Sequence, residues 1–135
     1  MNEPALIDRL LSTPGHWAVV GCSPRPARDS HRIARLLQDE GHRVTPVNPN
    51  VDGSILGVPV VADLEDIDDP IDVVDVFRRP AAAGAAVDAA IAAGAEAVWL
   101  QLGVIDHDAA ARAEAAGLGV VMDRGPAIEL RGRRS

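Results

Sequence analysis

The chain has 135 residues and a mass of 14.1 kDa, with 47% apolar and 24% charged residues. This length suits one domain with one core, and the composition argues against a disordered chain. The net charge of −7 and the 2% aromatic content argue against nucleic acid as a partner, because nucleic-acid binders usually present a basic face or aromatic side chains for base stacking.

Three missing sequence features bear on where the protein is located. No uncharged apolar run approaches ~20 residues, so no membrane span is expected. The first residues do not combine a basic segment with an apolar run, so no secretory signal is expected either. Cys22 is the only cysteine, which excludes an internal disulfide and a zinc site of several thiolates. These features predict a cytoplasmic protein that does not associate with membranes.

The first predicted elements are a leading helix, a strand and a second helix. The leading helix lies within residues 1–14. Residues 16–21 form a short apolar run that ends in glycine, which is typical of a buried strand. Ser30 then begins a helix in which apolar residues recur at helical spacing, and Gly41 ends it.

Two shorter strands follow in the middle of the chain. Residues 43–47 predict the second strand and residues 57–61 the third. Pro59 indicates that the third strand lies at an edge of the sheet, because proline has no backbone N–H to donate. Residues 63–67 predict one short helical turn.

The second half of the chain continues the alternation of strands and helices. Residues 71–77 predict the fourth strand. Residues 81–97 contain 11 alanines, and such small side chains predict a helix that packs close to a sheet. The remaining predictions are a strand at 97–102, a helix at 106–116 with Asp106 as N-cap, a strand at 119–122 and a loose tail at 131–135.

This alternation predicts the fold class. Strand–helix–strand repeats give a parallel sheet with helices on both faces. With right-handed crossovers, the expected α/β architecture is a doubly wound sheet of order 3-2-1-4-5-6, counted along the predicted strands. No linker divides the chain, so residues 1–135 are expected to form a single domain. Ligands of such sheets bind where the strand order reverses, which is beyond the first, fourth and fifth strands here.

The loop after the first strand has the properties of an anion site. It leads into a helix N-terminus, where backbone N–H groups and the helix dipole favour negative charge. Gly21 permits close backbone approach, and Ser23 and Ser30 offer hydroxyl groups. Arg25 and Arg28 supply positive charge within a locally basic segment of an acidic chain. The sequence therefore predicts a phosphate-binding site here.

The residues disfavour two common phosphate ligands. An NAD site would need GxGxxG and an acidic residue at the end of the second strand. The chain has serine in place of the second glycine, and the second strand ends at Asn48. The P-loop pattern is also absent, so nucleotide hydrolysis is disfavoured. A ligand with several phosphates and no need of that acid fits better.

Five ordered segments cover most of the chain between about residues 15 and 130. They read AVVGCSPRP at 18–26, VNP at 47–49, DVFRRP at 75–80, VWLQLG at 98–103 and VMDR at 121–124. These segments resemble the small bacterial CoA-binding proteins, whose domain is similar to the N-terminal domain of the succinyl-CoA synthetase alpha subunit. The resemblance implies a Rossmann-type CoA-binding domain. The chain departs from many family members at Gly125, where they have cysteine.

The resemblance also implies a ligand and a site. The ligand is coenzyme A or an acyl-CoA, with its diphosphate on the loop after the first strand and its adenosine near the end of the second strand. Residues after the fourth and fifth strands flank it. The implied binding residues are Gly21, Cys22, Ser23, Pro24, Arg25, Arg28, Ser30, Asn48, Pro49, Phe77, Arg78, Arg79, Gln101, Leu102 and Gly103.

No catalytic group of residues stands out. Cys22 is interpreted as a buried small side chain in preference to a reactive thiol. Ser23 and His31 lack a third group to orient the histidine, and the histidines lack metal-binding spacing. The sequence therefore predicts non-catalytic CoA binding. The alternatives are a partner-dependent component of an acyl-CoA synthetase and, less favoured, an NAD(P)-binding oxidoreductase. A protein partner or a homodimer stays open.

Overall fold

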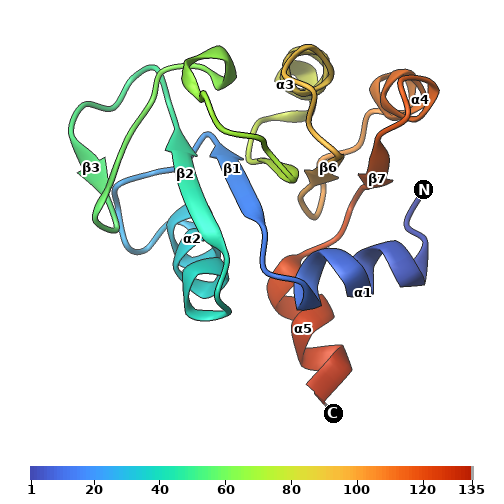
Figure 1. The fold of residues 1–135 in the computed structure, drawn as a ribbon, viewed down its shortest axis with the longest axis horizontal. Helices are drawn as coiled ribbons and strands as arrows, with labels where there is room; N and C mark the ends of the chain where they lie inside the picture. The colour runs from blue at the N-terminus through green and yellow to red at the C-terminus, as the bar shows by residue number, and fades with distance from the viewer. Residues whose placement is uncertain (135) are drawn as a thin grey trace.

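The computed structural model describes residues 1–134, with side chains described up to residue 132. Five strands form a parallel sheet in the order β2-β1-β5-β6-β7, and helices cover both faces (Figure 1). The predicted doubly wound α/β fold is confirmed, and these five strands lie in the predicted order. The strands are β1 (His16–Val20), β2 (Arg43–Val47), β5 (Val73–Val76), β6 (Ala97–Leu100) and β7 (Gly119–Val121).

The sheet divides the core into two layers, each covered by helices (Figure 1). All residues of β1, β5 and β6 are buried, because helices exclude water from both sides of these central strands. No helix among the described residues has the length and apolar composition needed to cross a bilayer. On one face lie α3 (Pro80–Ala92) and α4 (His107–Ala115), and on the other lie α1 (Pro4–Ser12), α2 (Asp29–Asp39) and α5 (Pro126–Arg134) (Figure 1).

The alanine-rich helix α3 packs against the sheet as predicted. Ala83, Val87 and Ala90 are fully buried on its inner side. The helix is shorter than the alanine-rich segment, because Gly94 with φ of 72° begins the turn into β6. In the next helix, Asp106 is the N-cap, and its Oδ1 accepts a hydrogen bond from the backbone N–H of Ala109 at 3.0 Å.

The predicted third strand is not a full member of the sheet. The chain forms a small antiparallel hairpin there, with β3 (Ser54–Ile55) paired to β4 (Val58–Pro59). Leu56 and Gly57 both have positive φ, which reverses the chain in a tight hairpin turn. Only Val61 forms a bridge to the last residue of β2. The proline at the end of β4 cannot donate a ladder hydrogen bond, so pairing stops early.

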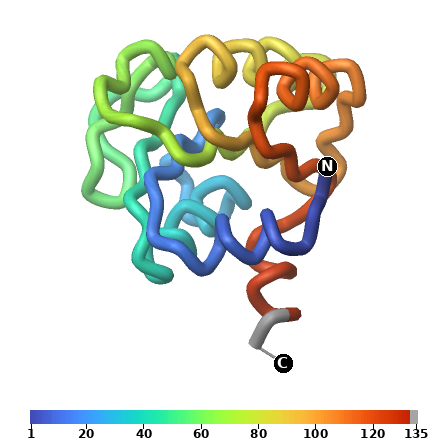
Figure 2. The backbone as a smooth tube through the Cα atoms, turned by 45° about the vertical axis from the view of Figure 1, so that its right-hand side comes forward, coloured from blue at the N-terminus to red at the C-terminus, as the bar shows by residue number. Residues whose placement is uncertain are grey.

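The predicted loose tail is also wrong for most of its length. Helix α5 continues to Arg134, because Pro126 suits a first helical position and Leu130 is buried against the sheet layer. Ser135 lies outside the described residues. Figure 2 shows the first residues of the chain beside the C-terminal segment, where the Asn2 N–H donates to the Val120 carbonyl at 2.9 Å.

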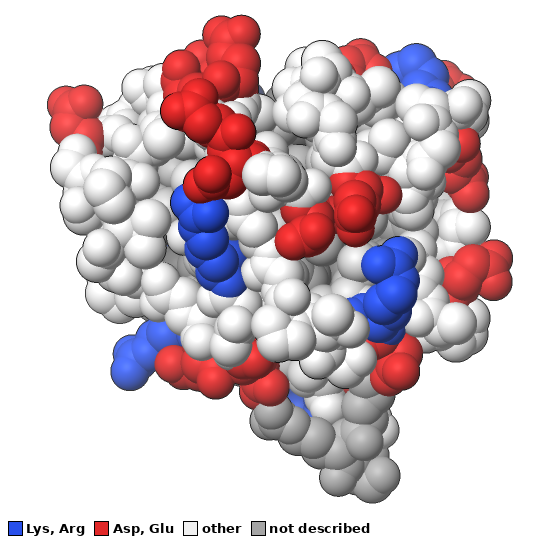
Figure 3. Space-filling view, viewed as in Figure 1, with Lys and Arg blue, Asp and Glu red and all other residues white. Residues whose placement is uncertain are grey.

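The acidic segment between β4 and β5 forms an exposed surface. It contains the short 3-10 helix η1 (Leu64–Asp66), which confirms the predicted turn. Figure 3 shows acidic side chains gathered over this segment. Asp69 at its end pairs with Arg43 at 2.7 Å, at the amino end of β2.

Candidate functional site

A cleft of about 700 Å³ opens at the carboxyl ends of the central strands. It lies where β1 is flanked by β2 on one side and β5 on the other, which is the predicted point of strand-order reversal. Its walls come from the loop after β1, the first turns of α2, the loops after β5 and β6, and the start of α5. The predicted site residues that line it are Gly21, Ser23, Arg25, Arg28, Ser30, Phe77, Arg78, Arg79, Gln101 and Leu102.

Five predicted site residues lie beside this cleft and do not line it. Cys22 is fully buried beneath it. Asn48 is half-buried, and its Nδ2 donates to the Cys22 carbonyl at 2.9 Å, so it ties the end of β2 to the loop after β1. The Gly103 N–H donates to Asp123 at 2.7 Å. Pro24 and Pro49 are exposed.

Gly21 is required by the packing of neighbouring strand ends. Its φ is +84°, and a Cβ at this position would lie 2.2 Å from the backbone oxygen of Phe77. Its N–H donates to the Val47 carbonyl at 2.8 Å. The glycine therefore lets the ends of β1, β2 and β5 come close together, which is a structural need that exists without any ligand.

Hydrogen bonds hold the loop after β1 against the start of α2. The Ser23 N–H donates to Ser30 Oγ at 2.9 Å, and Ser23 Oγ accepts from the Arg25 N–H at 3.1 Å. The His31 ring nitrogen Nδ1 lies 3.0 Å from the Ser23 backbone oxygen. His31 therefore contacts a carbonyl and not the serine hydroxyl, so no nucleophile–base pair forms. The first N–H groups of α2 have no acceptor within the helix, and they favour an anion.

Positive charge is concentrated around the cleft. Five arginines and one aspartate line it. Asp29 pairs with the arginine one turn along α2, and the other four arginines form no ion pair within the described residues. Guanidinium groups gathered in this way attract a ligand with several negative charges. The five are Arg25, Arg28, Arg32, Arg78 and Arg79.

A buried carboxyl group lies next to the cleft floor. Asp75 of β5 is 0% exposed, and burial raises its pKa to about 8. Gln101 Nε2 donates a hydrogen bond to Asp75 Oδ1, and Asp75 Oδ2 has no partner within the described residues. Burial and the charge of Asp75 raise the pKa of the Cys22 thiol to about 11. Cys22 is therefore a protonated, weakly nucleophilic group, in line with its interpretation as a buried side chain.

Sequence reasoning missed the wall that α5 provides. Gly125, Ala127 and Ile128 line the cleft, and Val104 and Ile33 add further apolar surface. No element was predicted for residues 125–130, and a loose tail was predicted only at 131–135. The available signal was the VMDR segment before Gly125, which ends a strand at the same edge as the other loops.

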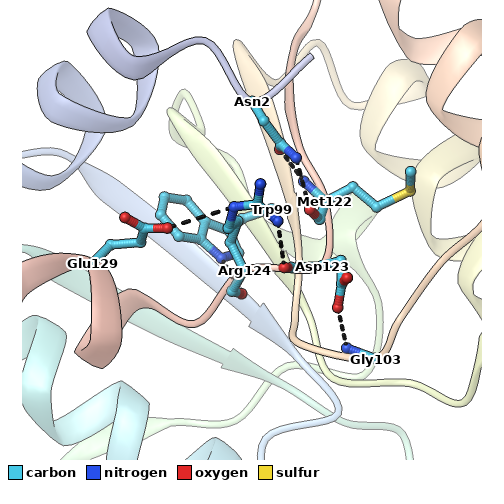
Figure 4. A network of polar contacts seen from close by, with 7 residues as sticks. All are labelled: Asn2, Trp99, Gly103, Met122, Asp123, Arg124 and Glu129. Carbon is cyan, nitrogen blue, oxygen red and sulfur yellow. Dashed lines mark hydrogen bonds and ion pairs between the residues drawn. The ribbon is translucent and has the colours of Figure 1, made fainter.

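A polar network holds the start of α5 in place (Figure 4). Asp123 adopts a positive φ of 58° and accepts the Gly103 N–H, which joins the loops after β6 and β7. Trp99 Nε1 donates to the Arg124 carbonyl at 2.9 Å, and the Arg124 side chain lies 3.6 Å from Glu129 of α5. These contacts fix the apolar wall relative to the sheet.

Comparison with known proteins decides the family. The family model described as CoA binding domain matches residues 15–131 of the chain. This chain belongs to the CoA-binding domain family. The resemblance carried by its five sequence segments is therefore confirmed.

Members of similar length share the sequence and the fold. The uncharacterized protein YneT of Bacillus subtilis is 38% identical over 125 residues, covering 91% of this chain and 92% of that protein. A hypothetical protein from Pyrococcus horikoshii is 34% identical with a TM-score of 0.90, covering 97% of this chain and 92% of that one. A protein from Thermus thermophilus is 35% identical with a TM-score of 0.89, covering 98% of both chains.

The same fold also occurs inside a larger enzyme. A dinucleotide forming acetyl-coenzyme A synthetase from Ca. Korarchaeum cryptofilum matches with a TM-score of 0.73 and 24% identity. The match covers 91% of this CoA-binding domain but 28% of the synthetase chain. At this identity the likeness concerns the fold alone.

Proposed function

We propose that this CoA-binding domain binds coenzyme A in the cleft and does not itself catalyse a reaction on it. The observation that carries the proposal is the set of four arginines around the cleft that form no ion pair within the described residues. Coenzyme A carries about four negative charges on its phosphates, which match this set. A cleft of about 700 Å³ also has the size of a cofactor site.

The strand order supports an orientation for the ligand. The diphosphate lies at the first turn of α2, close to Ser23 and Arg25. The adenosine extends towards Asn48 at the end of β2, and the pantetheine arm extends in the other direction, over the ends of β5 and β6. The apolar side chains Val104 and Ile128 suit the methylene groups of that arm.

The proposed absence of catalysis is supported by the groups beside the cleft. The Cys22 thiol is buried, and its pKa is raised to about 11. The Ser23 hydroxyl has no base within hydrogen-bond distance, because His31 contacts the backbone. Near the proposed phosphate position, no two described side chains form a hydrogen-bonded pair of nucleophile and base.

Calorimetry with the purified protein tests the proposal. Coenzyme A is expected to bind, and NAD is expected to bind far more weakly, because the end of β2 offers Asn48 and no acid for a ribose. Absence of heat with coenzyme A at about 1 mM, or equal binding of NAD, would overturn it.

The arginines are tested by a charge-matched pair of double variants. Arg25→Ala with Arg78→Ala removes two charges from the cleft and is expected to weaken coenzyme A binding by about 10- to 100-fold. The difference in affinity between the unaltered protein and the double variant should shrink at high salt, because ions screen the attraction that these two arginines supply. Arg9→Ala with Arg43→Ala removes two exposed charges at the opposite end of the sheet and should leave binding nearly unchanged.

A second candidate is a partner-dependent component of an acyl-CoA synthetase. It is favoured by the occurrence of the same fold as 28% of an acetyl-CoA synthetase chain. The test is to purify the protein with any bound partner and measure nucleotide-dependent formation of acyl-CoA. Turnover that requires both proteins would favour the synthetase component over the non-catalytic proposal. Coenzyme A binding without turnover would support the non-catalytic proposal.

A further inference from the structure

The buried pair of Asp75 and Gln101 connects the sheet interior to the cleft. Asp75 lies on β5 and is fully buried. Gln101 is the first residue after β6, lines the cleft and is 8% exposed. The Gln101 Nε2 group donates a hydrogen bond to Asp75 Oδ1 across the paired strands.

This hydrogen bond fixes which end of the Gln101 amide faces the ligand. In the structure the amide directs its NH2 group inwards to Asp75 Oδ1, which leaves Oε1 on the side away from this contact. Gln101 Oε1 has no hydrogen-bond partner among the described residues and is not enclosed by them. Its accessible surface therefore lies in the cleft, where it offers a hydrogen-bond acceptor.

The packing of the fold does not explain why position 75 carries a carboxyl group. Asp75 Oδ2 is buried without a partner within the described residues, which destabilises the folded protein. Val73 and Val76 occupy the same strand without such an unpaired group. A costly buried acid that contacts a cleft residue indicates a role in holding that residue.

Resting on the proposed function, we propose that Asp75 positions Gln101 so that Gln101 Oε1 accepts a hydrogen bond from a donor on the pantetheine arm of coenzyme A. Gln101 lies on the β6 side of the cleft, opposite the proposed adenosine position at β2. The arm offers two kinds of donor, its amide N–H groups and its terminal thiol. Gln101 is then a specificity residue, and Asp75 is a positioning residue.

The first test compares coenzyme A with adenosine 3′,5′-bisphosphate, which keeps the nucleoside and two phosphate groups but lacks the arm. Gln101→Met keeps the length of the side chain and removes its acceptor. We expect about 3- to 10-fold weaker binding of coenzyme A and unchanged binding of the bisphosphate. Gln38→Met is the matched control on α2, because Gln38 contacts Leu56 and does not line the cleft.

The second variant, Asp75→Leu, tests the positioning role because it removes the acceptor and keeps an apolar side chain of similar length in the core. Leucine offers the Gln101 amide no hydrogen-bond acceptor, so the amide is no longer held with its NH2 group inwards. Coenzyme A binding is expected to weaken by about 2-fold, with no change for the bisphosphate. This variant also keeps the test valid if Gln101→Met folds poorly.

Acetyl-CoA separates the two donors. If the thiol is the donor, Gln101→Met will weaken coenzyme A but not acetyl-CoA, and if an amide is the donor, it will weaken both. Either result supports the inference. Equal weakening of coenzyme A and the bisphosphate, or no weakening by either variant, overturns the inference and leaves the proposed function standing. No binding of coenzyme A or the bisphosphate to the unaltered protein overturns the proposed function itself.

Discussion

The two ends of the parallel sheet treat their polar groups differently. At the amino end, several polar groups are paired with one another, although Trp17 Nε1 is buried there without a partner among the described residues. His16 Nε2 lies 2.7 Å from Thr45 Oγ1, and the His16 N–H donates to Asp72 at 2.7 Å. His42 Nδ1 accepts from the Gly15 N–H at 3.1 Å. Each of these contacts joins segments that are distant in the sequence.

At the carboxyl end, several polar groups lack partners. Four arginines around the cleft form no ion pair within the described residues, and Asp75 Oδ2 is buried without a hydrogen bond. The main difference between the two ends is therefore the cluster of unpaired arginines at the carboxyl end, which is the observation that supports the proposed ligand site. Proteins tolerate unfavourable local arrangements mainly at functional sites.

The largest expected difference between the ends concerns glycine. Gly21→Ala at the carboxyl end places a methyl group against the Phe77 backbone and forces a positive φ, so we expect unfolding to become easier by about 4 kcal/mol. Gly15→Ala at the amino end meets the Asp72 side chain, with only Oδ2 at 3.1 Å closer than ordinary contact, and a loss of about 1 kcal/mol or less is expected. Urea denaturation measures both. Equal losses would remove the packing explanation for Gly21.

The next effect is the pH dependence from Asp75. Its folded pKa of about 8 lies above its unfolded value, so the folded protein binds the extra proton and loses stability as the pH rises. Asp75→Asn removes this dependence. Between pH 6 and pH 8 we expect the stability of the variant to rise relative to the unaltered protein by about 2 kcal/mol. Parallel curves of stability against pH would show that Asp75 does not titrate in this range.

The sequence predicted the five-stranded sheet because its signals are local. Apolar runs such as residues 97–102 and the alanine-rich segment show their period directly. The arginine cluster was visible as a charge excess near a helix N-terminus. Ten of the predicted site residues line the cleft because they lie in the segments that follow the central strands, and these segments could be located from the sequence.

Other features depend on contacts between distant segments and were not predictable. Asp75 follows an acidic stretch of exposed residues, and only the layer formed by α1, α2 and α5 makes it buried. The wall formed by Gly125 and Ile128 requires α5 to return to the sheet. The hairpin at Leu56 and Gly57 replaced a strand because a two-residue turn overrode the apolar pattern.

A smaller pH effect of opposite sign is expected at the amino end. Burial lowers the pKa of His42, and its Nδ1 must stay unprotonated to accept from Gly15. The unfolded chain binds the proton more readily, so stability falls as the pH drops below about 6.5. His42→Gln should remove this loss of stability between pH 7 and pH 5. Calorimetric unfolding at both pH values measures it, and an unchanged loss in the variant would contradict this assignment.

The smallest expected effect is the difference in unfolding free energy between variants that remove arginines at the two ends of the sheet. Arg43 pairs with Asp69, so Arg43→Ala should lower the unfolding free energy by up to about 0.5 kcal/mol. Arg25→Ala with Arg78→Ala removes charges that repel one another and have no partner, so stability should stay constant or rise by a few tenths of a kcal/mol, roughly, at low salt. A loss above about 1 kcal/mol in this double variant would mean that the cleft arginines stabilise the fold. The same protein samples serve for coenzyme A calorimetry, so a variant that keeps its stability but loses binding separates the role of these arginines from folding.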